Sequence, residues 1–98
     1  MYVRMVIGEA VSPVQIRELR SIFLEEIRSE IGKEDGNIDA NFMVEEGGNM
    51  VLMLTHWTSR ENCLKYHCSR AYRKFIAKTQ HLLIGDFVVK IFRCESPA

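Results

Sequence analysis

The segment Met50–Trp57 constrains the fold most, because it is a predicted strand with apolar side chains on both of its faces. Successive side chains of a strand point to opposite faces of the sheet. One face carries three apolar residues and the other face three more: Met50, Leu52 and Leu54, then Val51, Met53 and Trp57. A strand of this kind is covered on both sides. Helices of the chain can form one cover, and the other cover must come from elsewhere.

Three further strands are predicted around this one. Alternating or β-branched apolar residues predict strands over Tyr2–Val11, Ile38–Val44 and Phe87–Phe92. The glycines of Gly47-Gly48-Asn49 favour a hairpin turn, because glycine adopts positive φ without steric cost. With the two helices described next, the order is β-α-β-β-α-β, which predicts one ferredoxin-like α+β domain over residues 1–98. Its antiparallel four-stranded sheet carries both helices on one face.

The first helix has a clear start, a buried face and a stop. Ser12 suits the N-cap, Pro13 suits the first helical position, and Gln15 completes a capping box. Gly32 suits the C-terminal end. Apolar residues spaced for one buried helix face follow the cap: Ile16, Leu19, Phe23, Ile27 and Ile31.

The second helical region is predicted to begin with Thr58 as its cap and Glu61 at the third helical position. We expect this helix to run to about Cys68, to break near Ser69, and to continue from Ala71 to Leu83. Gly85-Asp86 then predicts a turn into the last strand.

The second face of the predicted sheet also carries large apolar side chains. Alternation places Ile38, Ala40, Phe42 and Val44 on one face of their strand. Candidates for the face without helices are Phe42, Met53, Phe87 and Phe92. An uncovered patch of this size exceeds what soluble monomers expose. The sequence therefore predicts a homodimer.

Charge is balanced overall but divided along the chain. Residues 14–46 hold four Lys/Arg against nine Asp/Glu, whereas residues 60–93 hold eight Lys/Arg against two acids. A nucleic-acid binder usually shows a clear basic excess, so no nucleic-acid partner is expected. Two oppositely charged, solvated helix faces explain the division; steering of an anionic ligand or a contact between subunits is the alternative.

Several observations bear on the compartment and on metal binding. No segment has the length and apolarity of a membrane span or of a signal peptide. The three cysteines form no disulfide framework, which fits a reducing compartment, so we expect a cytoplasmic protein without a membrane partner. Cys63 and Cys68 diverge around a helix, and no metal site is expected. Cys63 and His67 share a helix face, but no acid that would orient the histidine is evident.

Two residues are candidates for chemistry from their type and position. Trp57, the single tryptophan, sits where a strand passes into a helix. It is either a core or interface anchor or a pocket wall whose indole N–H contacts a ligand. His67 can relay protons near neutral pH if it reaches a cavity, or it can be a packing residue held by one hydrogen bond.

The stretch from Val51 to Phe75 resembles the antibiotic biosynthesis monooxygenase (ABM) family of small dimeric α+β barrels. Members show a strand that ends in Trp, a Ser two residues later and a His about ten residues later; here these are Trp57, Ser59 and His67. The family includes enzymes that oxygenate polycyclic phenols or quinols without metal or flavin. In them the substrate, as a stabilised carbanion, passes an electron to O₂.

The resemblance implies a cofactor-independent monooxygenase acting on a small aromatic, quinol or polyketide-like substrate. It implies catalytic roles for His67 and Trp57, and substrate contacts from Tyr72, Met53, Thr55 and Phe42. No cofactor and no metal are expected, and the partners are a second subunit and a small apolar or aromatic ligand. The apolar face of the sheet is the expected source of the cavity. The alternative is a dimeric ligand-binding or regulatory module without catalysis.

At three places the sequence differs from the site residues of family members, and these differences limit which functions the resemblance supports. Tyr72 stands where many relatives place a second histidine. Some polyketide-oxidising members have Asn four residues before the Trp, where this chain has Met53. Haem-degrading relatives have Asn on the first strand and His nineteen residues past the Trp; this chain has no Asn within residues 2–11 and has Ile76 at the second place. His81 is too late to serve, so a haem-binding or haem-degrading function is the less favoured alternative.

Overall fold

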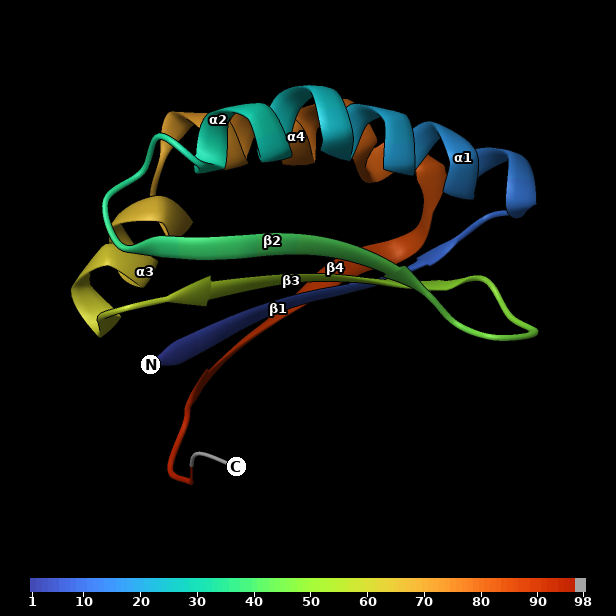
Figure 1. The fold of residues 1–98 in the computed structure, drawn as a ribbon. Coiled ribbons are helices and arrows are strands. Elements are labelled where there is room, and N and C mark those ends of the chain that lie inside the picture. The colour runs from blue at the N-terminus through green and yellow to red at the C-terminus, as the bar shows by residue number, and fades with distance from the viewer. Residues whose placement is uncertain (97–98) are drawn as a thin grey trace.

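The computed structural model describes residues 1–96 and has the predicted ferredoxin-like α+β fold (Figure 1). The strands are β1 (Tyr2–Ala10), β2 (Asn37–Val44), β3 (Met50–Trp57) and β4 (Leu83–Arg93). One helical rod follows β1 and consists of α1 (Pro13–Ile22), η1 (Phe23–Arg28) and α2 (Ser29–Ile31). The second helical region, between β3 and β4, contains α3 (Arg60–His67), α4 (Arg70–Thr79) and η2 (Gln80–Leu82).

The four strands form one antiparallel sheet in the order β2-β3-β1-β4. The helices cover one face, and within residues 1–96 no helix lies against the other (Figure 1). Because directly opposed residues of antiparallel strands share a face, the register places residues in rows across the sheet. The rows that face the helices include Phe42–Met53–Val6–Val89 and Ala40–Thr55–Arg4–Ile91. Three rows lie on the uncovered face, which we call the open face: Met43–Leu52–Ile7–Val88, Asn41–Leu54–Met5–Lys90 and Asp39–His56–Val3–Phe92.

The first helical rod buries the predicted face but is not a uniform α-helix. Ser12 caps it by accepting a hydrogen bond from the backbone N–H of Val14, and its hydroxyl also bonds the Gln15 side chain. The central turn, η1, is a π-helix, in which each hydrogen bond spans one residue more than in an α-helix. Four residues of the rod are buried against the sheet: Leu19, Phe23, Ile27 and Ile31. The rod ends at Gly32, as expected.

The cap of α3 is one residue later than predicted. Ser59, not Thr58, has the extended backbone of an N-cap and accepts from the N–H of Asn62. The backbone N–H of Thr58 instead donates to the carbonyl of Gly36 at 2.8 Å, which ties the end of β3 to the loop before β2. The break near Ser69 is confirmed, because Ser69 caps α4 by accepting from the N–H of Tyr72. The helix then ends at Thr79, short of the predicted Leu83.

The last strand begins at Leu83, so the predicted turn at Gly85-Asp86 is wrong. Gly85 lies inside β4 with φ of +75°, and the pairing with β1 shifts between Ile7 and Glu9. This irregularity brings the Phe87 ring over Gly8, where a Cβ would lie 2.8 Å from a ring carbon. The glycine in β1 therefore makes room for an aromatic side chain of the core.

The assignment of large apolar residues to the uncovered face was wrong in three of four cases. Phe42, Met53 and Phe87 lie on the helix-covered face and pack in the core. Phe92 alone lies on the open face, half exposed. Alternation along a strand tells which residues share a face, but not which face the helices cover. Within β2, Ile38 and Val44 are exposed rather than sharing the burial of Ala40 and Phe42, and pairing with β3 is irregular at Ile38.

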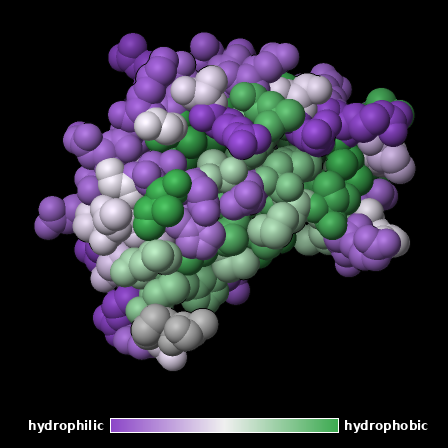
Figure 2. Space-filling view, in the orientation of Figure 1, coloured by the Kyte–Doolittle hydropathy of each residue, from purple (hydrophilic) through white to green (hydrophobic). Residues whose placement is uncertain are grey.

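The open face is nevertheless strongly apolar. Its rows contain Val3, Met5 and Ile7 of β1 beside Leu52 and Leu54 of β3, all only partly buried. A hollow of about 260 Å³ lies on this side near the β2–β3 hairpin, lined by Ile7, Met43 and Leu52 among others. Figure 2 shows hydrophobic side chains gathered over the strands, whereas the helical layer above them is mostly hydrophilic.

Part of the acidic first half of the sequence pairs with the basic second half through contacts between the two helical regions. Glu26 of η1 forms ion pairs with Lys74 and Lys78 of α4. The hydrogen bond from Lys78, followed by the nearby charges of both lysines, lowers the pKa of the Glu26 carboxyl despite an opposing effect of burial. Within residues 1–96, no helix is long and apolar enough to cross a membrane.

Candidate functional site

A small cavity lies between the sheet and the helical layer. Its walls are mostly aromatic and aliphatic, with two polar residues from the sheet: Arg4, Val6, Phe23, Ile27, Met53, Thr55, Tyr66, Tyr72 and Phe75. Its volume is about 10 Å³, and a single water needs about 10–15 Å³ measured in this way. In this form the cavity therefore has room for about one water molecule.

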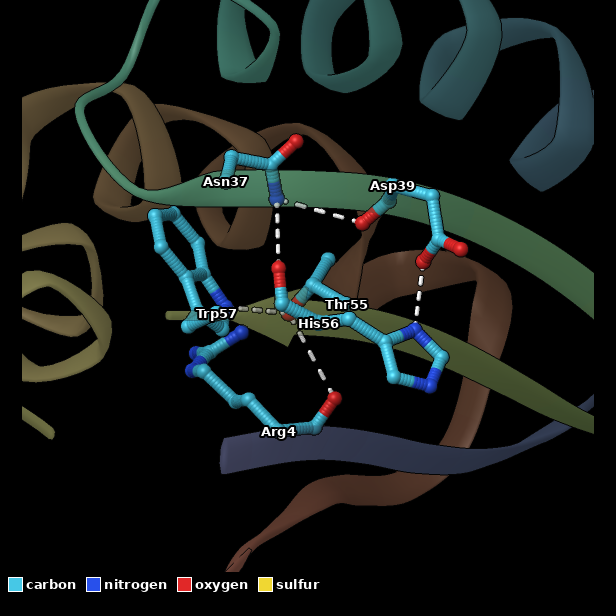
Figure 3. A network of polar contacts seen from close by, with 6 residues as sticks. All are labelled: Arg4, Asn37, Asp39, Thr55, His56 and Trp57. Atoms are coloured by element: carbon cyan, nitrogen blue, oxygen red, sulfur yellow. Dashed lines mark hydrogen bonds and ion pairs between the residues drawn. The ribbon is translucent and has the colours of Figure 1, made fainter. Parts of the chain in front are cut away.

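Trp57 holds the polar end of this cavity in place. Its side chain is fully buried, and its indole N–H donates to the hydroxyl of Thr55 at 2.9 Å (Figure 3). The Thr55 hydroxyl in turn lies 3.5 Å from the backbone carbonyl of Arg4. The indole also stacks on the ring of Tyr66, with 5.3 Å between ring centroids. Trp57 thus acts on the cavity through Thr55 and Tyr66, which line it.

Arg4 and His67 form the second polar contact of the site. The Nε and one terminal nitrogen of Arg4 lie 3.2 and 3.1 Å from His67 Nδ1. The guanidinium also lies over the ring of Tyr72, 4.0 Å from its centroid. Tyr72 stacks on His67 as well, at 5.7 Å. The strand residue Arg4 and the helix residues His67 and Tyr72 therefore form one cluster.

Burial, more than the charge of Arg4, sets the protonation of the groups around the guanidinium. Since a guanidinium only donates hydrogen bonds, His67 Nδ1 accepts, and the neutral imidazole carries its proton on Nε2. Burial, and then repulsion by Arg4, lower the pKa of His67. Burial raises the pKa of the Tyr66 phenol and of the Cys63 thiol, against the opposing effect of Arg4. Three groups around the guanidinium are therefore neutral at pH 7.

The structure brings most of the predicted site residues together. Met53, Thr55 and Tyr72 line the cavity, while Trp57 and His67 support it from behind. Phe42 does not line the cavity; its ring packs against Phe23, with 5.6 Å between centroids. His56, the neighbour of Trp57 in β3, points to the opposite face: it lies on the open face and bonds Asp39 (Figure 3).

Sequence reasoning missed Arg4, the one charged residue of the cavity lining. In β1 the uniformly apolar set is Val3, Met5 and Ile7, and this pattern alone favours that set for the core. The register reverses the assignment: Arg4 and Val6 face the helices. The sequence does show a lone arginine within an apolar strand. Its position opposite Thr55, however, follows only from the pairing of β1 with β3.

The described residues offer no alternative centre based on a metal or a disulfide. Among residues 1–96, no three His, Cys, Asp or Glu side chains are grouped so as to hold a metal ion. Cys63 is buried in the core, whereas Cys68 and Cys94 are exposed, and all three thiols are free.

Comparison with known families and structures gives a consistent result. The family model described as antibiotic biosynthesis monooxygenase matches residues 2–78. A search of functionally curated proteins gives no match.

Solved structures extend the match over the chain. Rv0793 from Mycobacterium tuberculosis is 18% identical, with a TM-score of 0.80 over 100% of this chain and 99% of that one. The monooxygenase ActVA-Orf6 of Streptomyces coelicolor, solved with nanaomycin D, is 14% identical, with a TM-score of 0.86 over 99% and 89%. SnoaB, a cofactor-independent oxygenase from Streptomyces nogalater, is 13% identical, with a TM-score of 0.78 over 98% and 95%. At these identities the structural matches establish the fold.

Proposed function

The chain belongs to the antibiotic biosynthesis monooxygenase family, and from that premise we propose that it is a cofactor-independent monooxygenase of a small aromatic, quinol or polyketide-like substrate. One observation carries the proposal: an aromatic cavity between sheet and helices has a polar cluster at one end. Planar, apolar substrates suit the walls, and the cluster suits an ionisable oxygen. In the proposed reaction a ring CH₂ becomes a carbonyl, and the second atom of O₂ leaves as water.

The predicted site residues take distinct parts in this proposal. His67 and Trp57 are the residues on which turnover depends, His67 beside Arg4 and Trp57 behind Thr55. Tyr72, Met53 and Thr55 contact the substrate directly, since they line the cavity. Phe42 supports the wall through Phe23. The positive charge of Arg4, which lines the same cavity, favours an anionic state of the substrate over the neutral one.

Substrate entry requires the helical layer to move away from the sheet. The cavity holds no more than about one water, so an aromatic ring needs additional space. Phe23 and Ile27 of η1 and Phe75 of α4 form much of its upper wall. The π-helical turn is the irregular part of this layer, and such turns are frequent at functional sites.

We also propose that the protein is a homodimer whose open faces pack together. The open face carries Met5, Ile7, Leu52 and Leu54 in adjacent rows and a hollow of about 260 Å³. Contiguous apolar surface of this kind marks an interaction site. A second copy supplies matching apolar rows and closes two sheets into the barrel that the sequence resemblance implies.

Oxygen consumption with a panel of hydroquinones and anthrones tests the proposed activity. We expect uptake above the uncatalysed rate, and a loss of roughly a hundredfold or more in His67→Ala, as is usual for a residue that transfers a proton. Trp57→Phe, which cannot donate to Thr55, should also slow turnover. His81→Ala is the matched control, because His81 is exposed on η2. Background rates with every substrate, or equal rates in all variants, would refute the proposal.

A non-catalytic ligand-binding module is the second candidate. It is favoured by the existing bond from Arg4 to His67 Nδ1, which occupies the one ring nitrogen able to accept a proton. This function predicts saturable binding of an aromatic ligand, no oxygen consumption, and variants that alter affinity alone.

A further inference from the structure

Arg4 is a buried positive charge without a carboxylate partner. It is 1% exposed, and among residues 1–96 no Asp or Glu oxygen lies within 4.0 Å of its nitrogens. Its contacts are instead an imidazole nitrogen and the faces of two phenol rings, Tyr72 at 4.0 Å and Tyr66 at 5.4 Å. Buried charges in proteins are generally paired. This one faces a cavity.

The contacts that Arg4 makes do not neutralise it. The bond to a neutral imidazole and the contacts with two phenol rings bring no negative charge to the guanidinium, and burying an ion without an opposite charge is costly. Burial raises the pKa of the nearby Cys63 thiol and Tyr66 phenol, so neither supplies a negative charge. The carboxylate of Glu34 acts on Tyr66 but forms no ion pair with Arg4, so among residues 1–96 no carboxylate contacts the guanidinium at the polar end of this cavity.

We propose that Arg4 is the anion-binding residue of the cavity and that its ligand is an acidic phenol or enol, held as the oxyanion. The inference deepens the proposed function, since it concerns the same cavity and names the class of compound that fits it. Arg4, Thr55 and Tyr72 all line this cavity, so an oxygen that reaches the guanidinium shares the cavity with the hydroxyl of Thr55 and the ring of Tyr72.

The contact with His67 gives the ligand proton a destination. When the ligand O–H bond breaks, the proton moves to His67 Nδ1, and the Arg4 N–H groups that bonded this nitrogen turn to the new oxyanion. The His67 ring then carries a proton on each nitrogen, and the ligand carries one negative charge. No electron is transferred in this step, so it needs no oxidant.

A chromophoric phenol tests this inference without oxygen chemistry. The probe is para-nitrophenol, whose ionised form absorbs in the visible, and the control is para-nitroanisole, which has the same ring but no ionisable proton. With the wild-type protein, at a pH where free nitrophenol is mostly neutral, we expect binding to produce the absorption band of the anion. Nitroanisole should bind about tenfold more weakly or worse, the smallest effect expected from the loss of one charge-assisted hydrogen bond.

Two variants assign the effect to Arg4. Arg4→Met should abolish the anion band and bind both probes alike, whereas Arg4→Lys, which keeps the charge, should retain part of it. Circular dichroism checks that each variant is folded. If Arg4→Met does not fold, the spectrum of nitrophenol bound to wild type and the ratio of its affinity to that of nitroanisole still show whether the cavity binds the anion.

Three results would overturn the inference: bound nitrophenol remains neutral, nitroanisole binds as tightly as nitrophenol, or neither probe binds at all. Because these probes are not turned over, the outcome is independent of oxygen consumption. Anion binding without oxygenation would leave Arg4 in its role and remove the monooxygenase proposal. Oxygenation with none of the expected anion binding would do the reverse.

Discussion

The two faces of the sheet differ in a way that their sequences conceal. On β1, the open face carries the uniformly apolar set Val3, Met5 and Ile7, whereas the face toward the helices carries Arg4 and Gly8. The more apolar side of β1 is thus the uncovered one, and the side in the core carries the charged residue. This distribution is the reverse of what is expected for a lone protomer, and it supports the proposed dimer.

The polar and small residues on the covered side and the apolar residues on the open side each serve the proposed function. The charge inside the core gives the cavity its polar end, and Gly8 makes room for the Phe87 ring. The apolar rows outside give a second copy a surface to bury. The polarity of the residues along β1 therefore does not show which face is buried in the protomer. It reflects instead what each face contacts: a cavity on one side and a proposed second subunit on the other.

The largest expected effect contrasts the same truncation on both faces. Phe75→Ala removes a fully buried ring and should lower the free energy of unfolding by about 3–5 kcal/mol at any protein concentration. Phe92 is 50% exposed on the open face, so Phe92→Ala should act on association, and its effect on the unfolding midpoint should fade on dilution. Urea denaturation at two protein concentrations measures both. Equal losses that do not change with concentration would break the comparison.

The next effect concerns association itself. Leu54→Asp places a charge in the central row of the open face and should weaken dimerisation by at least about 2 kcal/mol, or roughly thirtyfold in Kd. Val14→Asp is the matched control, because Val14 is exposed at the start of α1, away from the sheet. Sedimentation velocity separates monomer from dimer. A wild-type protein that is monomeric at micromolar concentration, or a Leu54→Asp dimer as tight as wild type, argues against the interface.

The smallest effect lies within the covered face and depends on pH. His67 has a native pKa below its ordinary value of about 6.5, first because of burial and then because of Arg4. Below that pH the unfolded chain binds a proton that the native protein does not. Acidification therefore favours unfolding until the native pKa is reached.

His67→Gln should consequently flatten the fall in stability on the acid side of about pH 6.5 and leave the profile above pH 7 parallel to wild type. Thermal melts of wild type and His67→Gln at several values from about pH 5 to about pH 8 compare the two stability profiles on both sides of the ordinary histidine pKa. An identical acid slope in the variant would mean that His67 is not held neutral by its surroundings.

The order of elements could be predicted from the sequence because it depends on local signals. The period of the apolar residues, the Gly47-Gly48 hairpin and the serine caps all act within a few residues. The exact cap between Thr58 and Ser59 could not, since both side chains suit an N-cap and the choice depends on a backbone bond from Thr58 to Gly36. The extent of β4 was missed for a similar reason, because pairing with β1 carries the strand through Gly85.

The candidate site was predictable in part. Trp57, Thr55 and Met53 follow from one strand, and Tyr72 from one helix. The contact that organises them joins residues 63 positions apart, Arg4 and His67. No local pattern encodes such a contact, because it depends on the sheet register and on the way that α3 closes over the end of β1.

The π-helical turn η1 also sets the phase of the helix above the cavity. Leu19, Phe23, Ile27 and Ile31 are spaced by four residues, and in an α-helix each such step overshoots one turn by about 40°. Three steps would rotate Ile31 by about 120° from Leu19, far enough to leave the sheet. All four are instead buried. The wider turn of η1 takes up the excess rotation, so a strict four-residue repeat stays in line with the sheet over the whole rod.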